Sequence, residues 1–184
     1  MIKLTTCCFL VLLLCGSLIP DAAAQSRSTK KAPAKSTASL HGTATVEELA
    51  QVLHRALQEN NPELLTTYFP TEGELKIMQD KGSADMKALL ELLEPEQLYQ
   101  NFQDEYRQVV EKGVNGMLNW SDMRLTDVMP GTPSAKNPMI VPVEMILADQ
   151  YTRMCSIKFN AVKLNNRYLL FQHMLLKCMP QEAE

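Results

Sequence analysis

A hairpin pattern near the end of the chain restricts the fold more than any other feature of the sequence. Residues 151–164 and 167–178 form two apolar-rich runs, and Asn165-Asn166 between them is a credible two-residue turn because Asn tolerates positive φ. In the first run, apolar and polar residues alternate. The apolar side chains that face one way are Cys155, Ile157, Phe159 and Ala161, and the polar side chains that face the other way are Ser156, Lys158 and Asn160. This period of two predicts a long antiparallel hairpin.

Two further segments before the hairpin have strand character. Residues 139–148 are apolar and β-branched, although Pro142 in this run indicates an edge position or a bulge. Residues 120–129 predict another strand, and a loop with three prolines separates the two runs. The second half of the chain therefore predicts about four antiparallel strands.

Helical signals dominate the first half of the folded part. Residues 46–57 place apolar side chains at helical spacing, and Thr45 with Glu48 forms a capping box. Further helical pieces are expected at 62–69, 71–78, 83–94 and 95–112. Candidate N-terminal caps are Asn61, Thr71 and Ser83, and the prolines that suit first helical positions are Pro62 and Pro95. The last helix is expected to end at Gly113 and Gly116. Helices followed by a meander predict an α+β fold with the helices on one face of the sheet.

The N-terminal 24 residues have the pattern of a secretory signal peptide. Lys3 precedes an apolar run that is too short to span a bilayer, and Ala22-Ala23-Ala24 fits the small-residue cleavage rule. An alternative is a lipoprotein anchored through Cys15, although Leu14 stands where the lipobox pattern has a small residue. Either route predicts export to the periplasm or the extracellular space.

Charge divides the remaining chain into two parts. Residues 25–42 carry four basic and no acidic residues, and the chain total of −3 leaves −7 for residues 43–184, because Lys3 and Asp21 cancel. We expect residues 25–43 to be a disordered basic linker and residues 44–180 to form a single domain. The acidic domain argues against nucleic acid as a partner.

Export leaves Cys155 and Cys178 as the two cysteines of the mature chain. An oxidising compartment favours a disulfide, which would contribute roughly 3 kcal/mol in the chain-entropy model. The simple hairpin register places Cys155 opposite Leu176, so one bulge is expected to align the sulfurs. The alternative is two buried free thiols.

The chain resembles the nuclear-transport-factor-2-like superfamily, which includes ketosteroid isomerases, polyketide cyclases and small exported bacterial domains. Residues 46–70 look like the first two helices of that family, and residues 153–175 look like its final hairpin. The resemblance covers roughly 44–178 and implies a cone-shaped α+β fold, similar to a cystatin, with helices on a curved sheet. Residues 71–94 depart from the pattern by adding helical material, as a lid or as packing.

Catalytic members of that family place an acid–base side chain in a cavity between the helices and the sheet. Five residues of this chain are candidates to line such a cavity: Tyr68, Tyr106, Trp120, Asp122 and His173. None lies in a motif of a catalytic member, and core packing or solvation explains each of them as well. The three histidines lack metal-ligand spacing, so we expect neither a metal nor another cofactor.

These observations lead to three hypotheses about function. The first is an exported, non-catalytic binding or interaction module, with a small apolar ligand or a protein as its partner. The second is a small cavity enzyme, an isomerase or cyclase that uses acid–base chemistry. The third, which follows from the family resemblance, is a structural protein that forms a homodimer through its sheet. No membrane-spanning segment is expected.

Overall fold

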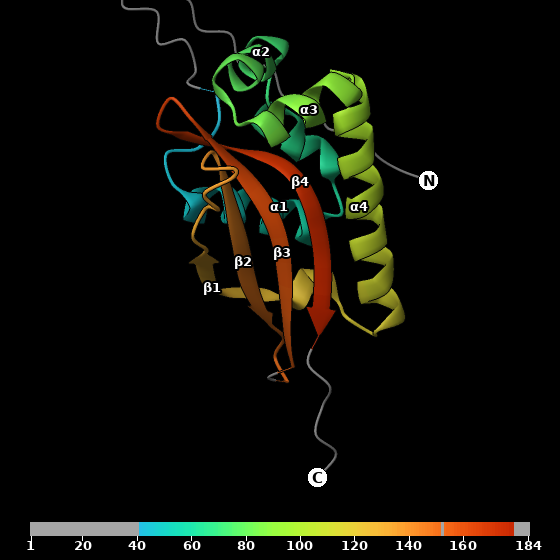
Figure 1. Ribbon diagram of the computed structural model, residues 1–184. Coiled ribbons are helices and arrows are strands. Elements are labelled where there is room, and N and C mark those ends of the chain that lie inside the picture. Colours follow the sequence, from blue (N-terminus) through green and yellow to red (C-terminus); the bar gives the residue numbers. More distant parts are fainter. Residues whose placement is uncertain (1–40, 152, 179–184) are drawn as a thin grey trace, which may run out of the picture. The chain divides into compact units, whose positions relative to one another are not determined.

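The computed structural model describes residues 41–151 and 153–178, and this part of the chain has an α+β fold (Figure 1). The helical elements are α1 (Val46–Glu59), a 3-10 helix (Pro62–Tyr68), α2 (Glu72–Lys81), α3 (Ala84–Leu92), α4 (Pro95–Asn115) and a second 3-10 helix (Trp120–Asp122). The strands are β1 (Arg124–Pro130), β2 (Ile140–Ala148), β3 (Met154–Leu164) and β4 (Arg167–Cys178). The predicted order of helices and then strands is confirmed.

Side-chain caps fix where three of the α-helices begin, and Asn61 caps the first 3-10 helix through the Glu63 N–H. The Thr45 hydroxyl accepts a hydrogen bond from the Glu48 N–H at 3.1 Å, and the Ser83 hydroxyl accepts one from the third residue of α3 at 3.2 Å. Thr71 and Glu74 form a complete capping box at α2. Each cap satisfies an N–H that has no partner within its helix. The caps predicted at Thr45, Thr71 and Ser83 are therefore confirmed, but the capping box predicted at Thr45 is incomplete, because the Glu48 carboxylate accepts the Ala44 N–H at 2.8 Å instead of the Thr45 N–H.

The four strands form one antiparallel sheet in the order β1-β2-β3-β4. The turn between β3 and β4 consists of Asn165 and Asn166, whose φ angles are 50° and 61°. Two successive positive φ angles are typical of the type I′ turn, which matches the twist of a hairpin. The predicted hairpin and its turn are confirmed.

The pairing of β3 with β4 shifts twice along the hairpin. The paired residues are Leu164 and Arg167 at the turn, Asn160 and Gln172 farther along, and Cys155 and Cys178 at the open end. Each of the two irregularities adds one residue of β4 relative to β3. The register that places Cys155 opposite Leu176 is therefore wrong, and two irregularities align the cysteines where one bulge was expected.

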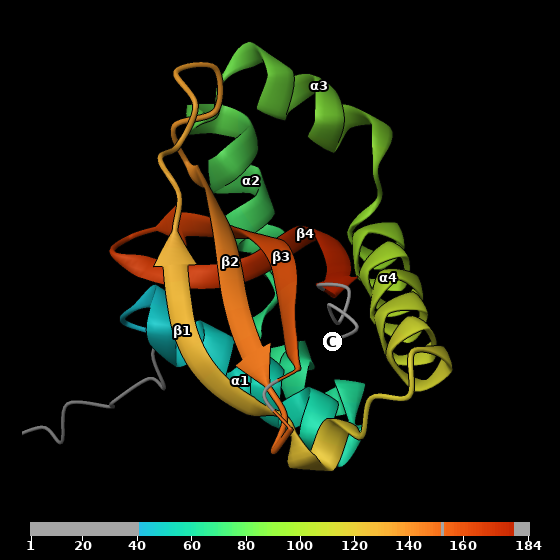
Figure 2. The same ribbon diagram turned by 90° about the horizontal axis from the view of Figure 1, so that it is seen from below.

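Helices cover both faces of the sheet, so the expectation that they lie on one face is wrong (Figure 2). Ala161 and Leu170 are paired and belong to a core with α1, whereas the next pair, Val162 and Leu169, belongs to a core with α2 and α3. Neighbouring strand residues point to opposite faces, so the two cores lie on opposite sides. We call the face against α1 the inner face and the other the outer face.

Residues 71–94 form α2 and α3, which pack on the outer face near the hairpin turn. Met78 and Met86 are buried in this second core together with Leu164 and Phe171. The helical material that departs from the family pattern therefore acts as packing at this end of the sheet. The rest of the outer face is not covered by α2 or α3.

Helix α4 runs beside β4, the edge strand of the sheet (Figure 1). Its first turns place Leu98 in the outer core, and later turns place Phe102 and Tyr106 in the inner core. The backbone N–H of Met174 in β4 donates a hydrogen bond to Glu105 Oε2 at 2.9 Å. The helix thus covers a strand edge that would otherwise expose unpaired backbone groups.

Two local expectations need correction. Trp120 does not begin a strand, because residues 120–122 form a 3-10 helix and β1 starts at Arg124. Gly113 does not end the long helix, which continues to Asn115; a Cβ at Gly113 would lie 2.3 Å from the Trp120 ring, so this glycine makes room for the indole.

Pro142 lies in β2, which is an interior strand for most of its length. The ladder with β1 ends at the pair of Pro130 and Val143, so Pro142 lies just beyond it. The carbonyl of Pro142 accepts a hydrogen bond from the Gly131 N–H at 2.7 Å. The missing N–H of this proline therefore faces the side on which β1 has ended, where the strand is locally an edge.

The folded part begins slightly earlier than expected. Thr43, the last residue of the expected linker, exchanges two backbone hydrogen bonds with Tyr168 of β4, at 3.0 and 2.9 Å. The predicted signal peptide, the Cys15 lipidation site and most of the linker lie outside the described residues.

Candidate functional site

The five candidate residues do not converge on one site. Tyr106 is a core residue of α4, and its hydroxyl donates a hydrogen bond to the Ala56 carbonyl of α1 at 2.7 Å. Burial raises the pKa of Tyr106 to about 12, so the phenol stays protonated at physiological pH. This residue ties α4 to α1 and reaches no open cavity through its hydroxyl.

Trp120 is also part of the inner core. Its indole N–H donates a hydrogen bond to the Val110 carbonyl at 3.2 Å, and its ring lies against Gly113. Asp122, in the same 3-10 helix, is exposed and accepts a hydrogen bond from the Asn119 side chain at 2.7 Å. Both residues shape the connection between α4 and β1.

Tyr68 and His173 line different pockets. Tyr68 ends the first 3-10 helix and lines a shallow pocket with Thr43, Arg55 and Arg167. It also packs against the inner core as a partly buried residue. Its position is consistent with a packing role at the start of the folded part.

Side chains pack closely where α1 meets the inner face, the position at which a cavity is expected from the family resemblance. Six large residues there are almost completely buried: Leu49, Leu53, Leu57, Met145, Ile157 and Phe159. The open space lies instead on the opposite face of the sheet.

A groove of 680 Å³ crosses the outer face, with α4 as one wall. It is lined by Glu105, Gln108, Val109 and Lys112 of α4, by Met129 to Gly131 at the end of β1, by residues 142–144 and 158–160 of the central strands, and by residues 173–175 of β4. This volume is in the range of small-molecule sites in proteins. Among the five candidates of the sequence, His173 lines the groove.

His173 owes its position to the irregular pairing of β4. It lies in the shifted stretch between the partners of Lys158 and Asn160, and its φ of 60° is in the left-handed region. The side chain is 74% exposed, and its Nδ1 lies 4.0 Å from Glu105 Oε1. The bulged strand thus directs an imidazole toward the carboxylate of α4 at the rim of the groove.

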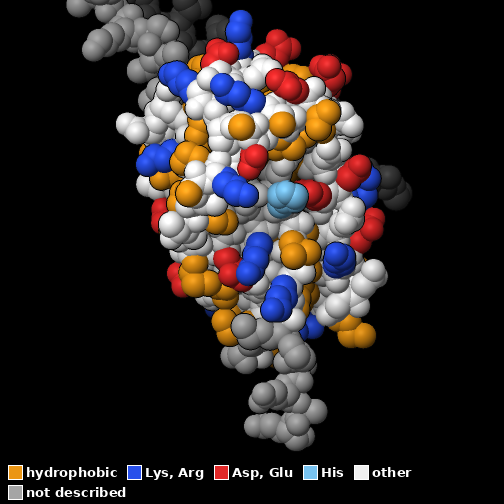
Figure 3. All heavy atoms as spheres, in the orientation of Figure 1, with side chains coloured by type: hydrophobic (Ala, Val, Ile, Leu, Met, Phe, Trp, Pro, Cys, Tyr) orange, Lys and Arg blue, Asp and Glu red, His pale blue; other side chains and the backbone are white. Residues whose placement is uncertain are grey.

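The floor of the groove contains a row of four side chains, one from each strand. Met129 pairs with Glu144, Glu144 with Lys158, and Lys158 with Leu175. Paired residues point to the same face, so the row runs across the sheet with apolar side chains at its ends and an ion pair in the middle. Figure 3 shows this face, on which hydrophobic and charged side chains alternate around a histidine.

The carboxylate in this row is held in its charged form. A hydrogen bond from the Ser156 hydroxyl lowers the pKa of Glu144, although partial burial acts in the opposite direction. The Lys158 ammonium also lowers this pKa, and its Nζ is 3.4 Å from Glu144 Oε2. The positive charge of Lys177 acts in the same direction. Glu144 is therefore a fixed anion rather than a proton donor at neutral pH.

Glu105, Lys112 and Glu144 line the groove but are not predicted as site residues from the sequence. The alternation of β3 predicts Lys158 on the polar side of its strand, and Lys158 lies on that side, the outer face. Lys112 follows Glu105 by seven residues, a helical spacing that places both on one side of α4. That spacing was the available signal, but it does not reveal which strand the helix meets.

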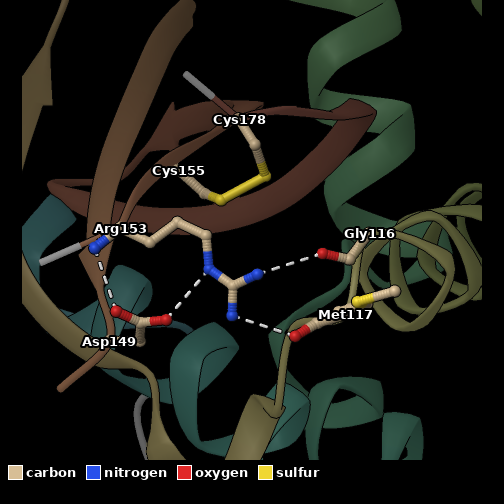
Figure 4. The surroundings of a disulfide bond; sticks show 6 residues. All are labelled: Gly116, Met117, Asp149, Arg153, Cys155 and Cys178. Carbon is tan, nitrogen blue, oxygen red and sulfur yellow. Dashed lines mark hydrogen bonds and ion pairs between the residues drawn. A yellow bond between two sulfur atoms is a disulfide. The ribbon is translucent and has the colours of Figure 1, made fainter. Parts of the chain in front are cut away.

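A disulfide joins Cys155 of β3 to Cys178 of β4 at the end of the hairpin opposite the turn (Figure 4). The two Cα atoms are 4.0 Å apart. Of the two alternatives, a disulfide or two buried free thiols, the structure has the disulfide. It holds together the strands whose register shifts twice between the turn and this pair.

Arg153 reinforces the same end of the domain (Figure 4). Its guanidinium donates to Asp149 Oδ2 at 3.0 Å and to the carbonyls of Gly116 and Met117, at 3.2 and 2.9 Å. Burial alone would raise the pKa of Asp149, but hydrogen bonds from Arg153 and Tyr151 outweigh it and lower the pKa. This contact joins the segment after α4 to the turn between β2 and β3.

Residues 41–151 and 153–178 hold no group of three or more His, Cys, Asp or Glu side chains arranged to bind a metal ion. None of the helices in this part of the chain has both the length and the hydropathy required to cross a bilayer.

Comparisons with models of protein families, with curated proteins and with solved structures found no match to this chain.

Proposed function

We propose that this chain is an exported, non-catalytic binding module of the nuclear-transport-factor-2-like kind, which binds a small ligand in the outer groove. The observation that carries the proposal is the groove itself, with its volume of 680 Å³ and its apolar and charged lining. Sites for small molecules commonly combine apolar walls with a few polar groups that orient the ligand. Met129, Pro142 and Leu175 supply apolar surface here, and α4 supplies the polar wall.

The protonation states in the groove favour binding over acid–base catalysis. Glu144 is fixed as an anion by Ser156 and Lys158, and Glu105 accepts the backbone N–H of Met174. His173 is largely exposed and stands 4.0 Å from Glu105, beyond hydrogen-bond distance. A general base that works efficiently is usually positioned by such a bond and partly shielded from water.

The disulfide supports the exported part of the proposal. Disulfides persist in the periplasm and outside the cell, and they are rare in reducing compartments. Cys155 and Cys178 lie directly opposite each other in the hairpin, so their bond fits the fold without rearrangement of the strands.

Binding of a neutral apolar fluorophore tests the groove. Residues 25–184 with the disulfide intact are titrated with N-phenyl-1-naphthylamine, whose fluorescence rises in apolar surroundings. Leu175→Glu places a charge where the groove has an apolar side chain that is 53% exposed. We expect saturable binding to the wild type, weakened about tenfold by this variant, because loss of apolar contact costs about 1.5 kcal/mol.

Leu92→Glu is the matched control. Leu92 is 80% exposed on α3 and does not line the groove, so this variant should bind the fluorophore like the wild type. Circular dichroism checks that both variants keep the fold. The proposal fails if the wild type shows no saturable binding, or if the two folded variants lose affinity equally.

A further inference from the structure

We infer that the ligand of the groove is an anionic amphiphile, a molecule with a hydrocarbon chain and a carboxylate or similar acidic head. The inference rests on the proposed function and specifies the chemistry of its ligand. Three lysines around an exposed leucine, in a domain that is acidic as a whole, are the feature from which it follows.

The three lysines come from different elements. Lys112 of α4 and Lys158 of β3 line the groove, and Lys177 is two residues beyond Leu175 on β4, so it shares the outer face. The charge of Lys177 acts on Glu144, which places it near the groove floor. Figure 3 shows Lys and Arg side chains on this face below the histidine, next to hydrophobic side chains, and others above it.

This cluster opposes the charge of its surroundings. The segment from 41 to 178 has 13 Lys and Arg against 18 Asp and Glu, a net charge of −5. Two carboxylates line the groove with these lysines: Glu105 accepts the backbone N–H of Met174, and Glu144 is paired with Lys158. Within the described residues, Lys112 and Lys177 form no ion pair with a carboxylate. A local positive potential of this kind attracts an anion.

The other groups of the groove determine the rest of the ligand. The Glu105 carboxylate is directed to Met174 N–H and His173, and it lies seven residues, about two helical turns, before Lys112. Leu175 lies beside the lysines, and Met129 and Pro142 extend the apolar surface toward β1. A head at Lys112 and Lys177 with a chain against these three side chains satisfies both the charge and the apolar surface.

Competition against bound N-phenyl-1-naphthylamine tests the inference. Decanoate, decan-1-ol and decyltrimethylammonium have the same chain with anionic, neutral and cationic heads. We expect decanoate to bind about fivefold more tightly than decan-1-ol at low salt, and decyltrimethylammonium to bind most weakly, because an exposed ion pair changes affinity by a small factor. Added salt should narrow these differences.

The double variant Lys112→Met/Lys177→Met identifies the residues responsible. It should weaken decanoate about fivefold and leave decan-1-ol unchanged, since methionine keeps a chain of similar length without the charge. Lys87→Met is the control, because Lys87 is exposed on α3 outside the groove and should have no effect.

Each outcome separates the two proposals. If the neutral alcohol competes as well as decanoate, or if the double variant binds decanoate normally, the anionic ligand is wrong while the groove remains a binding site. If neither the fluorophore nor any of the three amphiphiles binds, both proposals fail.

Discussion

The Tyr106 hydroxyl shows how one buried polar group makes stability depend on pH. Burial raises its folded-state pKa from 10.0 to about 12. The unfolded chain loses this proton near pH 10 and the folded chain only near pH 12, so the contribution of the neutral phenol is complete below pH 10 and is lost as the pH rises to about 12.

Tyr106→Phe should therefore change stability differently at the two ends of this pH range. At pH 8 we expect the free energy of unfolding to fall by about 1 kcal/mol, because the hydrogen bond to the Ala56 carbonyl is lost. Between pH 10 and 12 the deficit should shrink, since the variant has no proton to lose at this position. Urea unfolding at pH 8 and pH 11 measures both values.

The wild type, measured at the same two pH values, is the reference for this experiment. A deficit in Tyr106→Phe that is equal at both pH values would contradict the assigned pKa.

At the scale of elements, the two irregularities of β4 set both the disulfide and the groove. Together they move the register by two residues, so Cys178 comes opposite Cys155 and keeps the same face. The same stretch exposes His173 and directs Met174 N–H to Glu105. The irregular stretch of β4 therefore determines both the position of Cys178 in the disulfide and the contact of β4 with α4.

Deletion of His173 tests this coupling. It removes one of the two added residues, so a one-residue slip would turn Cys178 to the face opposite Cys155. We expect two free thiols per chain, counted by alkylation and intact mass. His173→Gly is the matched control: it keeps the length and tolerates the φ of 60°, so it should keep the disulfide. A complete disulfide in the deletion variant would show that the register is not set in this stretch.

Local patterns in the sequence predicted the elements but not their tertiary arrangement. The Thr71 capping box, the Asn165-Asn166 turn and the alternation of β3 depend on neighbours within a few residues, and all three are observed. The outer face and the groove depend on contacts between distant segments. Glu105 and Met174, for example, are 69 residues apart, so no short-range pattern could have joined them.

At the scale of the whole molecule, the disulfide connects the fold to the compartment in which the chain is expected to work. Its two cysteines are 23 residues apart, and closing a loop of this size contributes roughly 3 kcal/mol in the chain-entropy model. A chain that depends on this bond is less stable where thiols stay reduced. The predicted signal peptide and the disulfide thus both predict an exported protein.

Expression of the full chain in a bacterial host with an oxidising periplasm tests the prediction of export. We expect a periplasmic product that begins at Gln25 and contains the disulfide, identified by intact mass with and without reduction. Residues 25–184 purified with both thiols reduced should unfold with a free energy lower by roughly 3 kcal/mol, measured in urea. A lipidated product beginning at Cys15 would replace cleavage after Ala24 by the lipoprotein route, and a cytoplasmic product that retains residues 1–24 would contradict export.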